Sequence, residues 1–187
     1  IGQLANYKRE KFHGDICYYN SNLHLNATNV CEADCMFCSF ARIEPDMEQA
    51  YTMNVPQALN WIKERHSETM TEVHIVNGLH KELPFDYYLE LLAAIKKEYP
   101  KLHLKAFTAV EIHYFAEKFG MSYREILQQL IDVGLGSLPG GGAEIFADRV
   151  RKKICRDKVD AKGWLQVHET AHALGLKSNC TMLYGTV

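Results

Sequence analysis

The sequence lacks the features that would assign it at once to a special class of protein. No apolar run approaches the roughly 20 residues that a bilayer-spanning helix needs. No strong charge of either sign is present: the formal net charge of the 187 residues is −2, so neither nucleic acid nor a membrane is an expected partner. No signal peptide, internal repeat or low-complexity linker is visible. What remains is an ordinary globular composition, 47% hydrophobic and 24% charged, which suits one domain with a real core.

The sequence is also too poor in cysteine for a disulfide-stapled domain. Such domains are shorter and denser in cysteine than this chain, which has six. Three of the six lie close together and three are scattered: Cys31, Cys35 and Cys38 against Cys17, Cys155 and Cys180. The distribution predicts metal or redox chemistry for the first three in a cytoplasmic protein, and small buried apolar side chains for the others.

Strand-like and helix-like segments alternate after an irregular or short helical lead-in, residues 1–22. Strands are predicted at residues 23–29, 71–78, 102–108, 135–139 and 177–185, and helices at residues 55–66, 85–99, 110–120, 122–134, 143–155 and 162–175. This alternation predicts an α/β fold of βαβ units with a parallel sheet. A complete barrel takes about 250 residues, so residues 23–187 are expected to form an incomplete (β/α) TIM-like barrel of about five units, either open or part of a longer protein.

The strongest chemical signal is the stretch NVCEADCMFCSFAR, residues 29–42. Cys31, Cys35 and Cys38 have the spacing C-x3-C-x2-C in the loop after the first strand, which is the ligand-binding end of parallel α/β folds. Thiolates are soft ligands that suit zinc, copper(I) or iron–sulfur clusters. Three cysteines leave one iron of a cluster open to a further ligand. The alternatives are a zinc site with a fourth ligand such as His24, or free buried cysteines.

This loop resembles the signature of the radical SAM (S-adenosyl-L-methionine) superfamily, C-x3-C-x-aromatic-C, with Phe37 in the aromatic slot. The resemblance implies a partial or complete (β/α) barrel in which Cys31, Cys35 and Cys38 hold a [4Fe–4S] cluster. It implies that SAM chelates the fourth iron and is cleaved by an electron from the reduced cluster, giving methionine and a 5′-deoxyadenosyl radical. It further implies that Phe37 packs near the adenine of SAM.

Longer stretches, above all LPGGGAEIF and TMLYG, resemble the aminofutalosine synthase family of the futalosine route to menaquinone. The resemblance implies a small aromatic carboxylate substrate, 3-[(1-carboxyvinyl)oxy]benzoate. The adenosyl radical adds to it to give 6-amino-6-deoxyfutalosine, so that SAM is a co-substrate. It also implies a reductase, flavodoxin or ferredoxin as electron donor. The cyclic dehypoxanthinylfutalosine synthases share the pattern and are the closest alternative. The chain departs from the pattern in having Asn77 before Gly78, and the family proteins are about twice as long.

Residues near the predicted strand ends are the candidates for the rest of the site. The predicted cofactor-binding residues are Phe37, Asn77, Gly78, Glu144, Arg151 and Met182. Glu144 and Arg151, seven residues apart on a predicted helix, are expected to share a face. The candidates for binding the substrate carboxylates or for catalysis are His80, Thr108 and Ser137, and Glu111 is a further candidate to face the cofactor. For each, ordinary turn, surface or core packing is the alternative interpretation.

The motif H-E-x-x-H occurs at His168, Glu169 and His172 and raises the alternative of a zinc-binding hydrolase or binding module. The longer form of that motif would need a third histidine where the chain has Ser178. The helix has an apolar stripe that suits packing on the outside of a sheet. The spacing is therefore interpreted as a coincidence on a packing helix.

Overall fold

The computed structural model describes residues 1–185 and contains one parallel five-stranded sheet. The strands follow each other in space in sequence order, and every neighbouring pair is parallel. They are β1 (Asn22–Leu25), β2 (Glu72–Ile75), β3 (His103–Ala106), β4 (Leu135–Leu138) and β5 (Lys177–Ser178). Sequential parallel strands joined by helical crossovers are the arrangement of a (β/α) barrel, so the predicted α/β fold with an incomplete barrel is confirmed.

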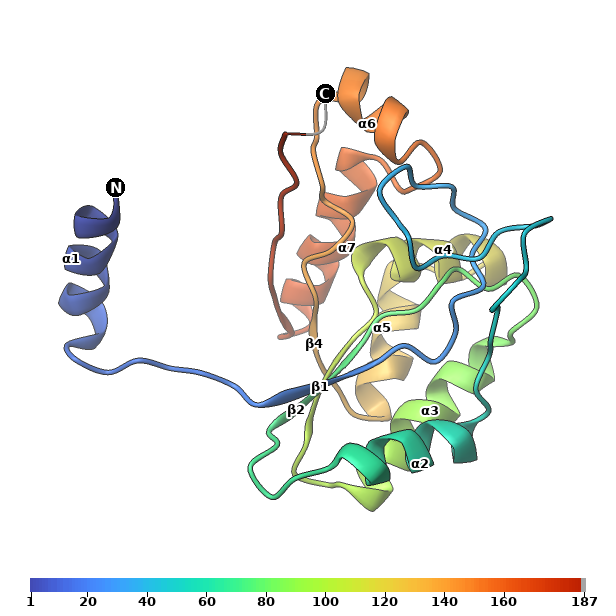
Figure 1. Ribbon diagram of the computed structural model, residues 1–187, viewed down its shortest axis with the longest axis horizontal. Coiled ribbons are helices and arrows are strands. Elements are labelled where there is room, and N and C mark those ends of the chain that lie inside the picture. The colour runs from blue at the N-terminus through green and yellow to red at the C-terminus, as the bar shows by residue number, and fades with distance from the viewer. Residues whose placement is uncertain (186–187) are drawn as a thin grey trace.

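The helices that join the strands lie on one side of the sheet (Figure 1). They are α2 (Val55–Arg65), α3 (Phe85–Glu98), α4 (Ala109–Phe119), α5 (Tyr123–Asp132) and α7 (Ala161–Ala173), whereas α6 (Asp148–Ile154) lies beyond the end of β4, at the top of the view. In the lead-in, α1 (Gly2–His13) has no buried residue and stands apart from the sheet at the end of an extended segment (Figure 1). None of the helices within residues 1–185 is both long and apolar enough to cross a membrane.

The two faces of the sheet differ because side chains alternate along each strand. Leu23, Val73, Leu104 and Leu135 pair in register, and they share the face that packs against the helices. The next row on that face contains Leu25, Ile75 and Ala106, all fully buried. The intervening rows carry polar side chains and form the opposite face, which we call the inner face.

Helix starts follow local capping chemistry. Asn54 and Ser122, both predicted as caps, begin α2 and α5 with complete capping boxes, in which the cap side chain and the residue three positions later exchange hydrogen bonds. Thr108 caps α4 in the same way, and Gly120 ends α4 in the left-handed conformation. These signals are local, which is why they could be read from the sequence.

All five strands are shorter than predicted, and two differences change the surroundings of the strand ends: one in the helix expected over residues 143–155 and one in the last strand. The helix expected over residues 143–155 begins only at Asp148, because the preceding loop is held open by contacts to Arg151 and by a bridge between Glu144 and Met182. Glu144 has φ of 46°, outside the right-handed helical region. The strand expected over residues 177–185 ends at Ser178, because its neighbour β4 ends before the glycine run and only isolated bonds continue, such as Thr181 N to Gly140 O.

Candidate functional site

A cavity of about 240 Å³ lies where the loops after β1, β2, β3 and β4 meet. Its wall includes Cys31, Cys35, Phe37, Cys38, Asn77, Gly78, Thr108, Glu111, Glu144 and Lys158. These residues are far apart in sequence and meet because the carboxyl ends of parallel strands share one edge of the sheet. Of the predicted site residues, the structure brings nine to this cavity: the three cysteines, Phe37, Asn77, Gly78, Thr108, Glu111 and Glu144.

The three cysteines of the loop face this one cavity without a disulfide among them. Cys35 is buried, Cys31 is half-buried and Cys38 is exposed. The backbone N–H groups of Ala33 and Leu79 donate to Cys31 Sγ at 3.4 and 3.3 Å. Burial raises the pKa of the Cys31 thiol, and it raises that of Cys35 to about 11. Both thiols are therefore protonated without a metal, and a bound metal would displace their protons.

The segment after β2 is packed closely against the cysteine loop. A Cβ atom on Gly78 would lie 2.1 Å from the carbonyl oxygen of Val30, so only glycine fits there without a shift of the backbone. The N–H of Gly78 donates to the carbonyl of Thr28 at 3.0 Å. The glycine therefore sets the distance between the cysteine loop and the end of β2.

Asn77 has an unsatisfied donor at the wall of the cavity. Its Oδ1 accepts from the N–H of Ala27 at 2.7 Å, whereas its buried Nδ2 has no partner among residues 1–185. A buried donor without a partner is costly, so it marks a place for a ligand acceptor. The cysteine thiols, the close approach at Gly78 and this free amide all fit a thiolate-bound cluster with a polar cofactor beside it.

Glu111 joins the ends of β2 and β3. Its carboxylate accepts from the N–H of Asn77 at 2.9 Å, from the N–H of Thr108 at 2.7 Å and from Thr108 Oγ1 at 2.9 Å. Burial raises the pKa of Glu111 to about 7, although these hydrogen bonds lower it. The carboxylate therefore fixes the backbone of Asn77 and Thr108 at the cavity. Because it already accepts three hydrogen bonds, it has little capacity left to accept one from a ligand.

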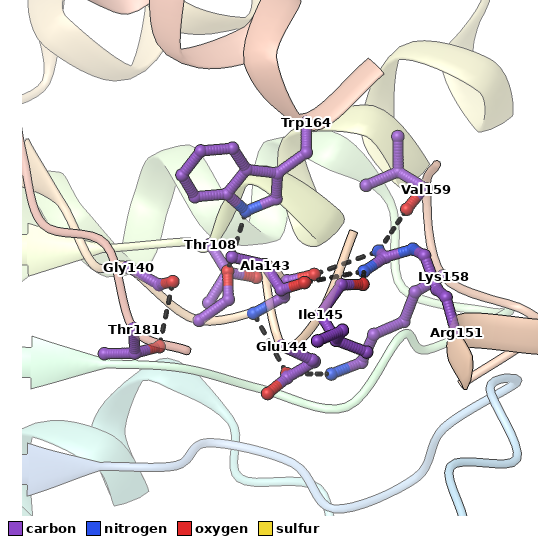
Figure 2. A network of polar contacts seen from close by, with 12 residues as sticks. Thr108, Gly140, Ala143, Glu144, Ile145, Arg151, Lys158, Val159, Trp164 and Thr181 are labelled. Carbon is purple, nitrogen blue, oxygen red and sulfur yellow. Dashed lines mark hydrogen bonds and ion pairs between the residues drawn. The ribbon is translucent and has the colours of Figure 1, made fainter. Parts of the chain in front are cut away.

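Besides Glu111, the wall contains two charged groups, Glu144 and Lys158, both shown in Figure 2. Lys158 Nζ lies 2.8 Å from Glu144 Oε1, and the N–H of Gly142 donates to the same oxygen at 3.1 Å. Lys158 Nζ also lies 5.1 Å from the centre of the Phe37 ring, within cation–π range. Sequence reasoning missed Lys158, because a lysine between Asp157 and Asp160 in a loop resembles a solvated surface residue.

The structure corrects the expectation for Arg151. This side chain does not lie among the residues of the cavity wall; it is buried, and its guanidinium donates to four backbone carbonyls (Figure 2). The acceptors are Ala143 at 2.7 Å, Gly142 at 2.9 Å, Ile145 at 3.3 Å and Val159. The expected shared helix face with Glu144 does not exist, since Glu144 precedes α6. Arg151 shapes the loop that carries Glu144, and Lys158 is the cation at the cavity.

Three further predicted residues lie away from the cavity wall. His80 Nδ1 accepts from the N–H groups of Glu82 and Leu83 at 3.1 and 3.3 Å, so it organises its own loop. Ser137 lies on β4, on the inner face, where its hydroxyl and His103 Nε2 are 2.7 Å apart. Met182 is 52% exposed and pairs with Glu144 by a backbone bridge outside the regular sheet. Met182 was expected to point into the barrel as part of a fifth strand over residues 177–185. Because β5 ends at Ser178, that alternation of side chains does not reach Met182.

The H-E-x-x-H motif lies on α7, on the outer side of the sheet. His168 is buried with its ring centre 3.9 Å from that of Trp164, and its two ring nitrogens have no partner within residues 1–185. Burial lowers the pKa of His168 to about 4. His172 Nε2 and Ser178 Oγ are 2.8 Å apart. In the part of the chain that the structure describes, no three His, Cys, Asp or Glu side chains are arranged to hold a single metal ion, and this applies to the H-E-x-x-H motif and to the cysteine loop alike.

Comparison with known proteins agrees with this geometry. The sequence pattern described as the radical SAM superfamily matches residues 25–186. Proteins named aminodeoxyfutalosine synthase from Thermus thermophilus and Streptomyces coelicolor are 46% and 48% identical over 99% and 100% of this chain, and the matches cover 50% and 48% of those proteins. A 5-amino-6-(D-ribitylamino)uracil–L-tyrosine 4-hydroxyphenyl transferase from Methanopyrus kandleri is 38% identical over the whole chain and 50% of its own length.

Among solved structures, a methylornithine synthase has a similar fold, with a TM-score of 0.71 over 94% of this chain and 48% of that chain. Its sequence identity is 16%, so the similarity concerns the fold alone. The chain spans about half the length of the curated relatives that it matches.

Proposed function

This chain belongs to the radical SAM superfamily, and from that premise we propose that it serves the addition of the 5′-deoxyadenosyl radical to 3-[(1-carboxyvinyl)oxy]benzoate. A rearrangement over the aromatic ring and loss of the acrylate carboxylate as bicarbonate would then give 6-amino-6-deoxyfutalosine, an intermediate of menaquinone biosynthesis. The relatives named aminodeoxyfutalosine synthase are 46% and 48% identical to this chain, compared with 38% for the tyrosine 4-hydroxyphenyl transferase of Methanopyrus kandleri. The proposal depends mainly on one observation: three thiols and a free amide donor line the same cavity at the carboxyl ends of the strands.

Cys31, Cys35 and Cys38 would hold the [4Fe–4S] cluster, since all three face the cavity from one loop. When bound, the cluster and SAM supply the electron and the sulfonium from which the adenosyl radical forms. The free Nδ2 of Asn77 would donate to an acceptor of SAM, and the close approach at Gly78 would hold the backbone beside it.

The remaining wall residues bind, orient and exclude water. Glu144 would accept hydrogen bonds from hydroxyl groups, and Lys158 would offset negative charge close to Cys35. Phe37, Phe40 and Val110 give the cavity an apolar lining, which limits the access of water to a reactive radical. Thr108 and Glu111 fix the backbone at the end of β3.

The proposal also implies partners of the whole protein. An electron donor, either a reductase or a flavodoxin or ferredoxin, would reduce the cluster, and a small aromatic carboxylate would be the substrate. No site for the donor follows from the cavity itself. The cytoplasmic location stays a prediction.

The test of the reaction is mass spectrometry of the products after anaerobic reconstitution with iron, sulfide, SAM and a chemical reductant. With 3-[(1-carboxyvinyl)oxy]benzoate, we expect a product that contains all the carbons of the adenosyl group. Free 5′-deoxyadenosine with no adenosyl-containing product would contradict the proposal. It would favour an enzyme that abstracts hydrogen, such as a cyclic dehypoxanthinylfutalosine synthase or a relative of the tyrosine 4-hydroxyphenyl transferases.

The test of the cluster is the iron content of single alanine variants. Cys31→Ala, Cys35→Ala and Cys38→Ala should each lose most of the bound iron and the brown colour. Cys17→Ala is the matched control, because Cys17 lies in the lead-in and should not affect iron binding. Burial was predicted for Cys17, Cys155 and Cys180, but only Cys155 is buried, whereas Cys17 and Cys180 are exposed. Stoichiometric zinc in place of iron in the unmodified protein would support the zinc-binding alternative.

A further inference from the structure

The inner face of the sheet carries a layer of polar side chains that the cavity wall does not include. His24, His74, Lys105 and Ser137 pair in register on β1 to β4, so their side chains lie on the same face. We call these four residues the histidine layer. Barrel interiors are usually filled by bulky branched apolar side chains, so a layer made only of polar residues indicates a purpose other than packing.

The two histidines of this layer have free donors. Their rings are stacked, with centroids 4.6 Å apart and planes 10° from parallel. Neither ring has a hydrogen-bond partner among residues 1–185, although His24 is exposed and His74 half-buried. Burial lowers the pKa of His74, and the nearby His24 and Lys105 lower it further. At neutral pH His74 is therefore an uncharged ring that presents one N–H.

The other members of the layer are held in place. Lys105 Nζ lies 3.1 Å from Glu72 Oε1, and that oxygen also accepts from the side chain of Asn22 at 3.3 Å. Ser137 is fixed by its contact with His103. The charged and titratable groups nearest the stacked rings are thus the Lys105 ammonium, the Glu72 carboxylate and the His103 imidazole, and Lys177 on β5, which pairs with Ser137, adds a second ammonium farther along the same row. The two stacked imidazoles remain available to a ligand.

The histidine layer lies next to the cavity along the strands. Asn26 and Val76, which line the cavity, follow His24 and His74 by two residues. Two residues of strand span about 6.6 Å. A substituted benzene ring bridges a distance of that order, so a ligand with one end in the cavity can place its other end on the layer.

We propose that the histidine layer binds the ring carboxylate of an aromatic acid substrate, with His24 and His74 as hydrogen-bond donors and Lys105 contributing positive charge. The inference rests on the proposed function, which supplies the substrate class. A carboxylate offers only acceptor oxygens, so it suits two ring N–H groups that have no hydrogen-bond partner within residues 1–185. The layer thereby orients the substrate so that its other end faces the cysteine loop.

The test is calorimetric titration of the cluster-loaded protein with two matched probes, 3-hydroxybenzoate and the uncharged 3-hydroxybenzamide. The carboxylate should bind at least tenfold more tightly than the amide. His24→Phe and His74→Phe keep a flat ring but remove the N–H groups, and each should weaken carboxylate binding at least tenfold. His66→Phe is the control, because His66 is an exposed histidine that stacks on Tyr99 away from the inner face.

Equal binding of the two probes, unchanged binding in the His24→Phe variant, or no binding at all would each overturn the proposal. His24 is exposed, so its replacement should leave thermal unfolding unchanged, and a loss of binding there cannot be ascribed to misfolding. Iron content is measured on the same samples. Absence of iron would overturn the proposed function, whereas absence of carboxylate binding with iron present would overturn only the assignment of the histidine layer.

Discussion

At the scale of single residues, the loop before α6 depends on one buried guanidinium. Arg151 uses both terminal nitrogens to contact four backbone carbonyls, which is the planar, forked geometry that arginine offers and lysine does not. These contacts satisfy carbonyls that would otherwise be buried without donors, because residues 142–145 belong to no helix or strand. The side chain acts on the cavity indirectly, through the position of Glu144.

Replacing Arg151 with methionine should therefore be strongly destabilising. We expect the free energy of unfolding in urea to fall by ~2–4 kcal/mol, because several buried carbonyls lose their donor. Arg151→Lys should recover less than half of this loss, since one ammonium cannot reach all four carbonyls. Arg149→Met is the matched control, because Arg149 is exposed on the same helix. If Arg151→Met lowers the free energy of unfolding by less than ~0.5 kcal/mol, the contacts of Arg151 with the four carbonyls do not stabilise the loop.

His168 should make the stability of the chain depend on pH. Its pKa in the folded protein, about 4, lies below the usual 6.5, so the fold favours the neutral ring. The corresponding stabilisation is present above pH 6.5 and is lost as the pH falls toward 4, by up to ~3 kcal/mol.

In the His168→Phe variant, the free energy of unfolding in urea should fall less between pH 7 and pH 4 than in the unmodified protein. His66→Phe, at an exposed site, should show the same fall as the unmodified protein. If His168→Phe and the unmodified protein lose stability in parallel, burial of a neutral imidazole is not the cause.

At the scale of elements, short segments at the carboxyl ends of the strands are positioned by backbone contact. The end of β2 touches the cysteine loop at Gly78 and Val30, and Glu111 joins the ends of β2 and β3. The helices contribute through their caps, since Thr108 both begins α4 and lines the cavity. The site is thus built on element ends that the sheet brings together.

Gly78→Ala should separate the cysteine loop from the end of β2. The added Cβ would lie 2.1 Å from the carbonyl oxygen of Val30, so one backbone segment must move. We expect a loss of ~1–3 kcal/mol in the free energy of unfolding and a clear fall in bound iron after reconstitution. Gly2→Ala, where an added Cβ meets nothing within 4 Å, should change neither quantity. Full iron content in Gly78→Ala would show that the close approach is not needed.

At the scale of the whole molecule, the parallel sheet and the helices on its outer side form one apolar core, and the lead-in stands apart from it (Figure 1). The first nineteen residues include no buried side chain. Contacts to the sheet begin with Asn20, which donates to Glu72, and Ser21, whose carbonyl accepts from Thr71. The stability of the sheet should therefore not depend on α1.

Deletion of residues 1–19 should change the free energy of unfolding by less than ~0.5 kcal/mol, because no buried contact is removed. Urea unfolding of the shortened and the full chain measures the difference. Extending the deletion through Ser21 removes the contacts to Glu72 and Thr71 and serves as the matched comparison. A large loss on removal of residues 1–19 alone would mean that α1 packs on the sheet in solution.

The amino-acid sequence by itself determined the features that depend on local chemistry. Alternating apolar segments predicted the five strands and their parallel order, and Asn54 and Ser122 were correctly predicted to begin helices. The spacing of Cys31, Cys35 and Cys38 and its place after β1 predicted the thiol-lined site. The caps and the cysteine spacing are signals within a few neighbouring residues, and the parallel order follows from the alternation of strands and helices along the chain.

Tertiary structure alone decided which charged residue reaches the cavity. Arg151 and Lys158 are both basic residues near the glycine run, yet one donates to buried carbonyls and the other pairs with Glu144 at the cavity wall. The start of α6 and the end of β5 differ from the prediction for a similar reason, since contacts between distant segments override local helix and strand preferences there. The histidine layer was likewise invisible beforehand, because its members stand side by side only through strand register, and register is a property of the folded sheet.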